Sequence, residues 1–389
     1  MKANWPEVIV KDVCDLVVDC VNKTAPVLDY SSPYKMIRTT NVRYGVVNLE
    51  NARSVSKETY EKWTRRSVPK FGDIILTREA PLGEVGMLKS NEKVFLGQRT
   101  MQYRANPEKL DSHFLLYALQ ESFMQGQIRA SGSGSTVEHM RVGDAENLKI
   151  KLPHMDVQQK IGANLSAYDD LIENNNRRIA ILEEMARSLY REWFVKFRFP
   201  GHEEVKMVDS ELGQIPEGWE IKKTADLLKR LTVKAKYTQE NIESTGIIPV
   251  IDQSRDEILG FHNNQADVMA NNDFPIAIFG DHTCKMQLLV EAFSIGPNVI
   301  PFTSKINRPM QYIFYLVNSL VTTKEYKRHW TELISKEVVL APQNITERFS
   351  NLIKPLLAQI NLLKKKNHNL KTQRDMLLPK LISGKIKAI

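Results

Sequence analysis

The sequence predicts a mixed α/β protein built from two similar halves, each of which is a globular domain followed by one long helix. An apolar periodicity typical of a long helix runs through the middle of the chain, and the same periodicity returns at its C-terminal end. The stretch before each helix consists of short β-type segments separated by Gly, Asn and Pro. The chain has 389 residues, which is too long for one ordinary hydrophobic core, so at least two domains are expected.

The first predicted domain covers residues 1–155. Its β-type segments include "VRYGVVNL", "GDIILTREA" and "VGMLKS", and "HFLLYALQES" follows them as a helix-like segment. The polar run "LPHMDVQQKI" then leads from a β-like stretch through a proline into the first long helix, which we place at residues 156–198.

The first long helix carries a continuous apolar seam. Alternating steps of four and three residues give an average spacing of 3.5, which is sustained over several heptads and is typical of a coiled coil. The seam positions are Ile161, Leu165, Tyr168, Ile172, Asn175, Ile179, Leu182, Ala186, Leu189 and Trp193. Asn175 is the polar exception, and a buried Asn in such a seam usually fixes the register of pairing.

The second half repeats this plan. Residues 199–218 are rich in Pro, Gly and charge and are predicted as a linker, and residues 219–341 form the second domain, with β-type segments such as "IIPVID" and "FPIAIFGD". The second long helix is placed at residues 342–389, after the similar entry "EVVLAPQNITERF". Its seam positions are Phe349, Ile353, Leu356, Ile360, Leu363, Asn367, Leu370, Arg374, Leu377 and Leu381.

Pro355 lies inside the second seam. A proline within a helix costs about 3 kcal/mol and bends it, so this helix is expected to bend at Pro355 or to begin near it. The alternative interpretation of both seams is a pair of ordinary bundle helices. The matching register and the matching strand–proline entries favour a repeated coiled-coil element instead.

Composition favours a cytoplasmic protein with a polyanionic partner. The net charge is +8 with a pI near 9.1, and nucleic acid is the commonest partner of basic proteins. No run approaches the ~18 apolar residues of a membrane span, and the start of the chain lacks the pattern of a signal peptide. Cys14, Cys20 and Cys284 form no C-x-x-C pair, so they are predicted to be reduced thiols and not zinc ligands.

Catalytic motifs are not found in the sequence. The Gly/Ser-rich run "ASGSGSTVEH" lacks the lysine of a nucleotide-binding loop, and Asp209, Glu220 and Lys222 have nuclease-like spacing but span the predicted linker. His282 beside Asp281 and His139 beside Glu138 have no nucleophile at a recognisable spacing. The sequence therefore predicts no enzymatic activity, no cofactor and no bound metal.

Several motifs resemble one family, the DNA specificity (S) subunits of type I restriction–modification systems. They are "LPHMDVQQKI", "RRIAILEEMARSLYREWFVKFRFPGHE", "LGQIPEGWE", the terminal "LLPKLISGKI", and in the second domain "IPVIDQSRDEILGF", "FGDHT" and "YKRHWTEL". The resemblance covers the whole chain. It implies a non-catalytic scaffold in which two target-recognition domains each read one half of a split double-stranded DNA site. It also implies that the two helices pair antiparallel as a spacer, and that methyltransferase (M) subunits, two of them, and restriction/translocase (R) subunits are the partners.

Loop residues of both domains are candidates for DNA contact. Arg pairs well with guanine, Asn and Gln pair well with adenine, and contacts to phosphate give affinity without sequence. The candidates are Lys35, Arg38, Thr39, Thr40, Asn41, Arg43, Arg78, Gln98, Arg99, Ser133, Ser135, Thr136 and Arg141 in the first domain, and Gln253, Ser254, Arg255, His282, Thr283, Lys285, Arg328 and His329 in the second. Each could instead be a solvated surface residue or a turn cap.

Two other functions remain open from the sequence alone. One is a structural coiled-coil adaptor that joins proteins and does not read DNA. The other is an enzyme fused to a recognition domain, although the two halves leave no room for a catalytic domain. The basic charge and the polar loops favour DNA recognition over both.

Overall fold

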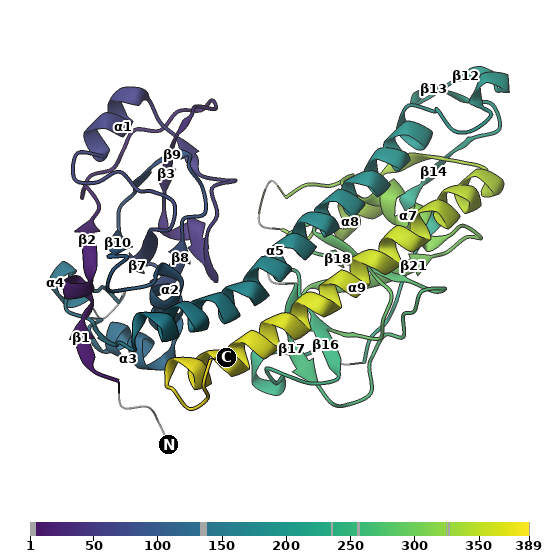
Figure 1. Ribbon diagram of the computed structural model, residues 1–389. Coiled ribbons are helices and arrows are strands. Elements are labelled where there is room, and N and C mark those ends of the chain that lie inside the picture. The colour runs from purple at the N-terminus through teal and green to yellow at the C-terminus, as the bar shows by residue number, and fades with distance from the viewer. Residues whose placement is uncertain are drawn as a thin grey trace. The chain divides into compact units, whose positions relative to one another are not determined.

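The computed structural model describes residues 5–132, 138–234, 236–254, 257–323, 325 and 327–388 (Figure 1). The chain divides into two compact units. The first consists of Met1–Glu173 with Asn367–Ile389, and the second of Asn174–Lys366. Each unit therefore contains one sheet-bearing domain and one half of each long helix. The predicted α/β class, with two domains and two long helices, is confirmed.

The two long helices are α5 (Met155–Tyr190) and α9 (Gln343–Ile382). A π-helical turn, Arg191–Val195, continues α5. The helices run antiparallel in both units. In the first unit Asp169 of α5 forms an ion pair with Arg374 of α9, and in the second Trp193 packs on Phe349 with ring centroids 6.1 Å apart.

The predicted seam positions of both helices are all buried or half-buried. In the second unit Ile179 packs against Ile360 and Leu363, with Leu182 partly buried beside them. Several apolar residues off the seam are exposed, for example Ile181 at 61% and Leu362 at 45%. The helices therefore bury one face each, although which seam residue pairs with which partner remains a prediction for most positions.

Pro355 does not start the second helix, contrary to one of the two expectations from the sequence. Helix α9 begins at Gln343 and continues through Pro355. Proline removes the donor that the carbonyl of Asn351 would use, but both residues are exposed, so water can satisfy that carbonyl. Ile353 is fully buried near the proline, and this burial offsets the cost.

The first unit has a six-stranded sheet in the order β2-β10-β7-β8-β5-β4 and a three-stranded sheet in the order β6-β3-β9. Strands β1 and β11 form a separate antiparallel pair. Ser56 and Asp111 cap helices α1 and α2 by accepting hydrogen bonds from backbone N–H groups of the first turn. The strands are β1 (Glu7–Ile9), β2 (Cys14–Asp19), β3 (Tyr34–Ile37), β4 (Val42–Arg43), β5 (Gly45–Val47), β6 (Arg53–Ser54), β7 (Ile74–Arg78), β8 (Leu82–Met87), β9 (Lys93–Leu96), β10 (Thr100–Ala105) and β11 (Lys149–Lys151). The helices are α1 (Lys57–Trp63), α2 (Ser112–Gln120), α3 (Ser122–Ala130) and α4 (Val142–Glu146), with short 3-10 turns at Val10–Val13 and Thr39–Asn41.

The second unit has a four-stranded sheet in the order β15-β21-β18-β19 and a three-stranded sheet in the order β17-β16-β20. Strands β12 and β13 form one antiparallel pair, and β14 and β22 another. The strands are β12 (Met207–Ser210), β13 (Gly213–Pro216), β14 (Glu220–Lys223), β15 (Leu228–Arg230), β16 (Ile248–Ile251), β17 (Ile258–His262), β18 (Ile276–Gly280), β19 (Met286–Leu289), β20 (Ser294–Ile295), β21 (Val299–Ser304) and β22 (Glu337–Leu340). The helices are α6 (Thr224–Leu227), α7 (Met310–Val317) and α8 (Trp330–Ile334), with 3-10 turns at His202–Glu204 and Gln239–Asn241.

The two domains share one topology. The order β2-β10-β7-β8 in the first corresponds to β15-β21-β18-β19 in the second, and all neighbours in both runs are antiparallel. In the small sheets, β3 pairs parallel with β9 as β16 does with β20. The pairs β1–β11 and β14–β22 each precede a long helix. The repeat expected from the sequence therefore extends to strand order, and β7 and β18 are equivalent central strands.

Each long helix contributes to the cores of both domains. In the first unit Ile161 and Leu165 of α5 and Leu381 of α9 join the domain core. In the second, Phe194 lies 4.8 Å from Tyr312 and 5.0 Å from Phe349, ring centroid to ring centroid. The predicted linker 199–218 contains the β12–β13 hairpin, and its Ile215 is buried in this same core. No helix in the described part of the chain is long and apolar enough to cross a membrane.

Candidate nucleic-acid interface

A cavity of about 490 Å³ opens where strand β7 ends in the first domain. Four of the candidates from the sequence line it, although they come from three separate segments: Arg78, Gln98, Arg99 and Arg141. The remaining lining residues are Asp19, Asn22, Glu79, His139 and Val142. Sequence reasoning did not select these five for DNA contact, because the folded sheet and not a local motif brings them to the cavity.

The backbone fixes the arginines of this cavity. Arg78 is the last residue of β7, and its N–H donates to the carbonyl of Arg99 at 2.8 Å while its own carbonyl accepts from Met140 N–H at 2.9 Å. Arg99 occupies the left-handed region with φ 69°, in the turn between β9 and β10. These contacts hold the end of β7, the β9–β10 turn and the loop before α4 together.

The side chains of the cavity are partly neutralised. Arg99 Nη2 lies 3.2 Å from Glu79 Oε1, and His139 Nδ1 lies 3.6 Å from Glu79 Oε2. Arg78 is only 8% exposed, and its Nη1 donates to the carbonyl of Met140 at 2.9 Å. A buried cation and a rim of exposed arginines, beside the carboxylates of Asp19 and Glu79, make a site suited to an anion.

The segment "YKMIRTTNVRYG" combines structural and accessible residues. Asn41 is 6% exposed, and its side chain accepts from Arg38 N–H at 2.9 Å and donates to the carbonyl of Asn48 at 3.0 Å. It therefore caps a turn in this structure. Thr39 donates to the carbonyl of Ala80 at 3.0 Å, and Thr40 is exposed.

The remaining basic residues of this segment differ in their partners. Lys35 forms an ion pair with Glu92. Arg38 and Arg43 are half-buried, and the Nε of each has no hydrogen-bond partner among the described residues. These two arginines keep donors available for a ligand.

In the second domain, the loops that follow β16 and the central strand β18 bring together five further candidates. Gln253 Oε1 accepts from His282 N–H at 3.1 Å, and Thr283 Oγ1 donates to the carbonyl of Gln253 at 3.2 Å. Lys285 Nζ donates to the carbonyl of Ser254 at 3.0 Å. The loops after β16 and β18 are thus bound to each other by their own side chains.

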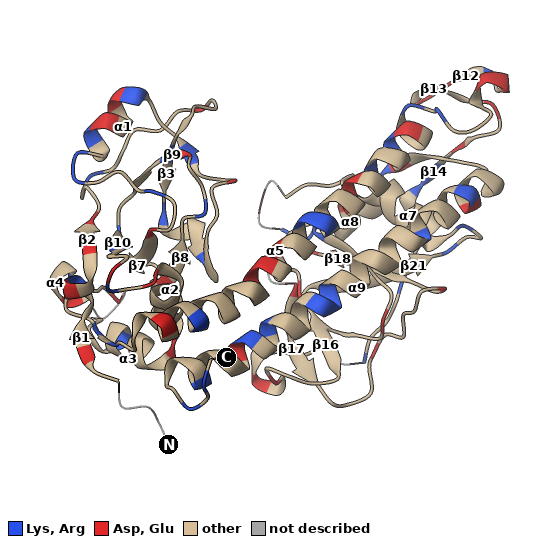
Figure 2. Cartoon of the chain, viewed as in Figure 1, with Lys and Arg blue, Asp and Glu red and all other residues tan. Residues whose placement is uncertain are grey.

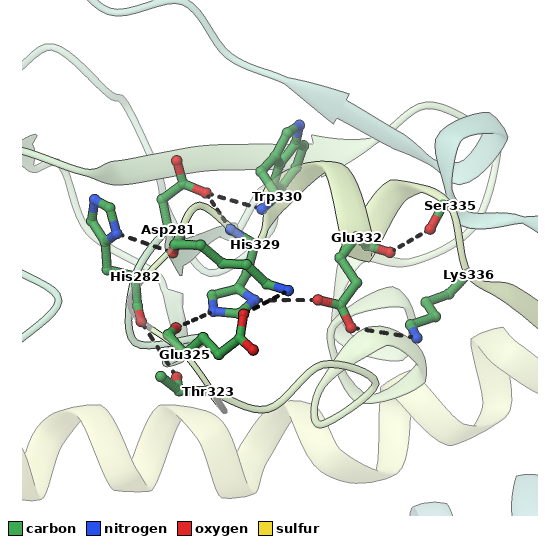
Figure 3. Close-up of polar contacts among 10 residues, drawn as sticks. Asp281, His282, Thr323, Glu325, His329, Trp330, Glu332, Ser335 and Lys336 are labelled. Carbon is green, nitrogen blue, oxygen red and sulfur yellow. Dashed lines mark hydrogen bonds and ion pairs between the residues drawn. The ribbon is translucent and has the colours of Figure 1, made fainter.

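His329 lies inside the second domain and not on its surface. It is 1% exposed, and its ring nitrogens lie 3.2 Å from a carboxylate oxygen of Glu332 and 3.2 Å from the carbonyl of Glu325 (Figure 3). Asp281 accepts from the backbone N–H groups of His329 and Trp330 at 3.1 and 2.9 Å. The structure therefore favours a positioning role for His329, whereas the neighbouring Arg328 side chain is 78% exposed.

Four candidates, Ser133, Ser135, Thr136 and Arg255, lie outside the described residues. Basic and acidic side chains are interspersed along α5 and α9, as Figure 2 shows. On α5, Arg187 pairs with Glu183 at 3.2 Å. Burial alone would raise the pKa of Glu257, but Lys364 of α9 and Lys285, which precedes β19, hold that pKa below its ordinary value. The positive charge of the long helices is thus partly compensated within each unit.

The described residues contain no group of His, Cys, Asp and Glu side chains that could hold a metal ion. The three cysteines are free thiols, and burial raises the pKa of Cys14 to about 12, so its nucleophilic thiolate form is suppressed. His282 Nδ1 lies 3.0 Å from the carbonyl of Lys327, which gives this histidine a loop-bonding role in place of a catalytic one.

Comparison with known proteins agrees with these features. Residues 2–184 match the family described as "Type I restriction modification DNA specificity domain". The type I restriction enzyme MjaIX specificity subunit of Methanocaldococcus jannaschii is 26% identical over 359 residues, covering 86% of this chain and 82% of that protein. The type I restriction enzyme EcoBI specificity subunit of Escherichia coli is 24% identical over 196 residues, covering 49% of this chain and 41% of that protein.

A solved structure gives the same fold. The crystal structure of the type I restriction–modification system S subunit from M. genitalium covers 97% of this chain and 96% of its own, with a TM-score of 0.57 and 16% sequence identity. The repeated domains, the paired long helices and the sequence matches lead to one conclusion. The chain belongs to the family of type I restriction–modification DNA specificity subunits.

Proposed function

We propose that this chain is the non-catalytic, sequence-specific DNA-binding subunit of a type I restriction–modification complex. The observation that carries the proposal is the repeated sheet order. It presents two equivalent strand exits, by which we mean the residues at and just after the C-terminal ends of β7 and β18, and these carry different side chains. The first exit carries Arg78 and Glu79, and the second carries Gly280 and Asp281. One topology with two sets of side chains suits a DNA site of two unlike halves.

The candidate residues fall into two groups, those with donors free to contact DNA bases and those whose polar atoms already bind the protein. Exposed or half-buried donors such as Arg38, Arg43 and Gln253 suit the edges of bases, where Arg recognises guanine and Gln recognises adenine. Asn41 and His329 are better suited to holding loops, because their polar atoms already bind the protein. The paired helices would set the spacing between the two halves of the DNA site.

Methyltransferase and restriction subunits are the proposed partners. Two methyltransferase subunits would fit a chain with two equivalent junctions between a domain and a helix pair, since each junction offers a similar surface. A complex that modifies genomic DNA would act in the cytoplasm. The stoichiometry is measurable as the mass of the purified complex.

The test is a map of methylated adenines in cells with and without this gene. We expect a single motif with two separated parts to lose methylation when the gene is removed and to regain it when the gene is restored. Replacing residues 5–154 by the corresponding domain of another specificity subunit should change one part of the motif only. An unchanged methylation map after deletion of the gene would contradict the proposal.

A further inference from the structure

The cavity at the end of β7 holds a buried cation to which no described residue supplies a matching anion. Arg78 is 8% exposed, and its Nε is buried with no hydrogen-bond partner among the described residues. Within the same residues, the one hydrogen bond of its guanidinium goes to a neutral acceptor, the carbonyl of Met140. No carboxylate in the described part of the chain forms an ion pair with Arg78.

Two other buried or half-buried arginines of this unit are neutralised by carboxylates. Arg104, on the neighbouring strand β10, makes two hydrogen bonds of 2.8 Å to the carboxylate of Asp73. Arg374 pairs with both Asp169 and Asp375. A buried charge without a partner is costly, so a site that keeps one is usually completed by a ligand of opposite charge. Arg78 lacks such a carboxylate among the described residues, and it is more deeply buried than the half-buried Arg38 and Arg43.

The rest of the cavity does not supply that charge. Glu79 is engaged by Arg99 and His139, and Asp19 is engaged by Arg66. Arg141, at the rim, is exposed and has no carboxylate partner in the part of the chain that is described. Two uncompensated cations thus face one opening, Arg78 deep in it and Arg141 at its edge.

We propose that this cavity binds a phosphodiester group of the DNA backbone, an inference that rests on the proposed function. A guanidinium donates two parallel hydrogen bonds to a phosphate, and Arg78 has its Nε available for one of them. The lining residues include no Phe, Tyr or Trp side chain on which a base could stack. A guanidinium this deep cannot reach the base edges of a stacked duplex, whereas phosphates project from it.

The equivalent exit in the second domain has a built-in anion. There Asp281 follows β18 and accepts from the backbone N–H groups of His329 and Trp330. The first domain has arginine at the matching position and therefore needs an external anion. The phosphate contact would position the first domain on the DNA without specifying sequence, which leaves Arg38 and Arg43 as base-reading candidates.

The experiment measures binding of the full chain to mixed-sequence DNA duplexes and to its mapped target at several NaCl concentrations. Arg78→Met should weaken binding to every duplex by the same factor, roughly tenfold, and lower the slope of log affinity against log salt by about 0.9. Arg78→Lys keeps the charge, so it should keep the slope while losing part of the affinity. Lys57→Met is the control, since it removes one exposed charge that pairs with Glu61 on α1, away from the cavity.

A second measurement uses inorganic phosphate and thermal unfolding. Phosphate should raise the Tm of the wild-type chain more than that of Arg78→Met at equal ionic strength, and it also reports whether the variant folds. If Arg78→Met fails to fold, the same DNA-binding and Tm measurements are made on Arg78→Lys and Arg141→Met instead.

The outcomes separate this inference from the proposed function. Unchanged affinity and slope in folded Arg78 variants would overturn the phosphate site while leaving DNA recognition intact. A loss confined to one base position would make Arg78 a base-reading residue and would also overturn it. If the wild type binds no duplex at all, the proposed function fails. A rise in Tm with phosphate that depends on Arg78 would then support a site for free phosphate. If phosphate also gives no such rise in Tm, both the phosphate site and the proposed function are overturned.

Discussion

Replacing Leu363 by Ala should measure what helix pairing contributes to stability. Leu363 is 1% exposed and packs with Ile179 and Ile360 in a small cluster between α5 and α9, separate from the domain cores. Truncating a buried Leu to Ala costs about 2–5 kcal/mol, from the lost apolar burial and the cavity left behind. A domain is stable by only about 5–15 kcal/mol, so a loss of ~3 kcal/mol in the second unit is a large fraction.

The assay is thermal unfolding of the full chain, followed by circular dichroism. For a unit of this size, ~3 kcal/mol corresponds to a fall in Tm of about 6–12 °C. The matched control is Leu362→Ala, the adjacent residue on the same helix, which is 45% exposed. Both substitutions change helix propensity equally, so only burial differs between them. Equal Tm values for the two variants would refute the assignment of Leu363 to the buried seam.

Three further predictions concern chemistry, specificity and pH. The purified chain should transfer no methyl group from S-adenosylmethionine to DNA, since it offers no catalytic constellation; incorporation of label from a methyl-labelled donor would show otherwise. Combined Arg38→Ala and Arg43→Ala should cost ~1–3 kcal/mol per lost base contact at one half of the target, and Gln253→Ala at the other half, as binding to half-site variants would measure. The pKa of Glu257 is lowered in the fold, so its contribution to stability is present at neutral pH and lost as pH falls below about 4.5. Glu257→Gln should then reduce Tm at pH 7, and its difference from the wild type should shrink steadily as the pH is lowered below about 4.5; a difference that does not shrink would assign the effect to packing.

The long helices and the fold class could be predicted because their signals are local. An apolar residue every 3.5 positions indicates a buried helical face whatever surrounds it, and the twenty seam positions are buried or half-buried accordingly. Pro355 was harder to place, because its cost depends on whether the carbonyl of Asn351 meets water or protein. That property belongs to the folded surface and not to the sequence around the proline.

The site was less predictable, because its geometry depends on contacts between distant segments. Nothing in the sequence connects the polar residues Arg78, Gln98 and Arg141, which come from three separate segments. The folded sheet places all three around one cavity. A polar residue in a loop also looks the same in sequence whether it faces solvent or the interior. His329 is buried and holds its loop, whereas its neighbour Arg328 is exposed. Burial of polar side chains is decided by tertiary partners such as Asp281 and Glu332, which sequence spacing does not indicate.

The two strand exits also differ in how much change each can accept. At Gly280 an added Cβ would lie 2.5 Å from Thr283 Oγ1 and 2.7 Å from the Cβ of Gln253, so even Ala would displace the two loops that those residues join. Gly280→Ala should therefore cost about 1–3 kcal/mol, or roughly 2–12 °C in Tm. Gly296→Ala, where the nearest atom is 3.5 Å away, is the control and should change Tm little. Asp281, the residue that matches Arg78, accepts hydrogen bonds from the backbone N–H groups of His329 and Trp330, so an arginine there would lose both bonds and the chemistry of Arg78 would not move to the second domain by one substitution. New specificity would then require exchange of whole loops on the shared sheet, and a stable Gly280→Ala protein with unaltered DNA binding would show that this packing does not constrain the exit.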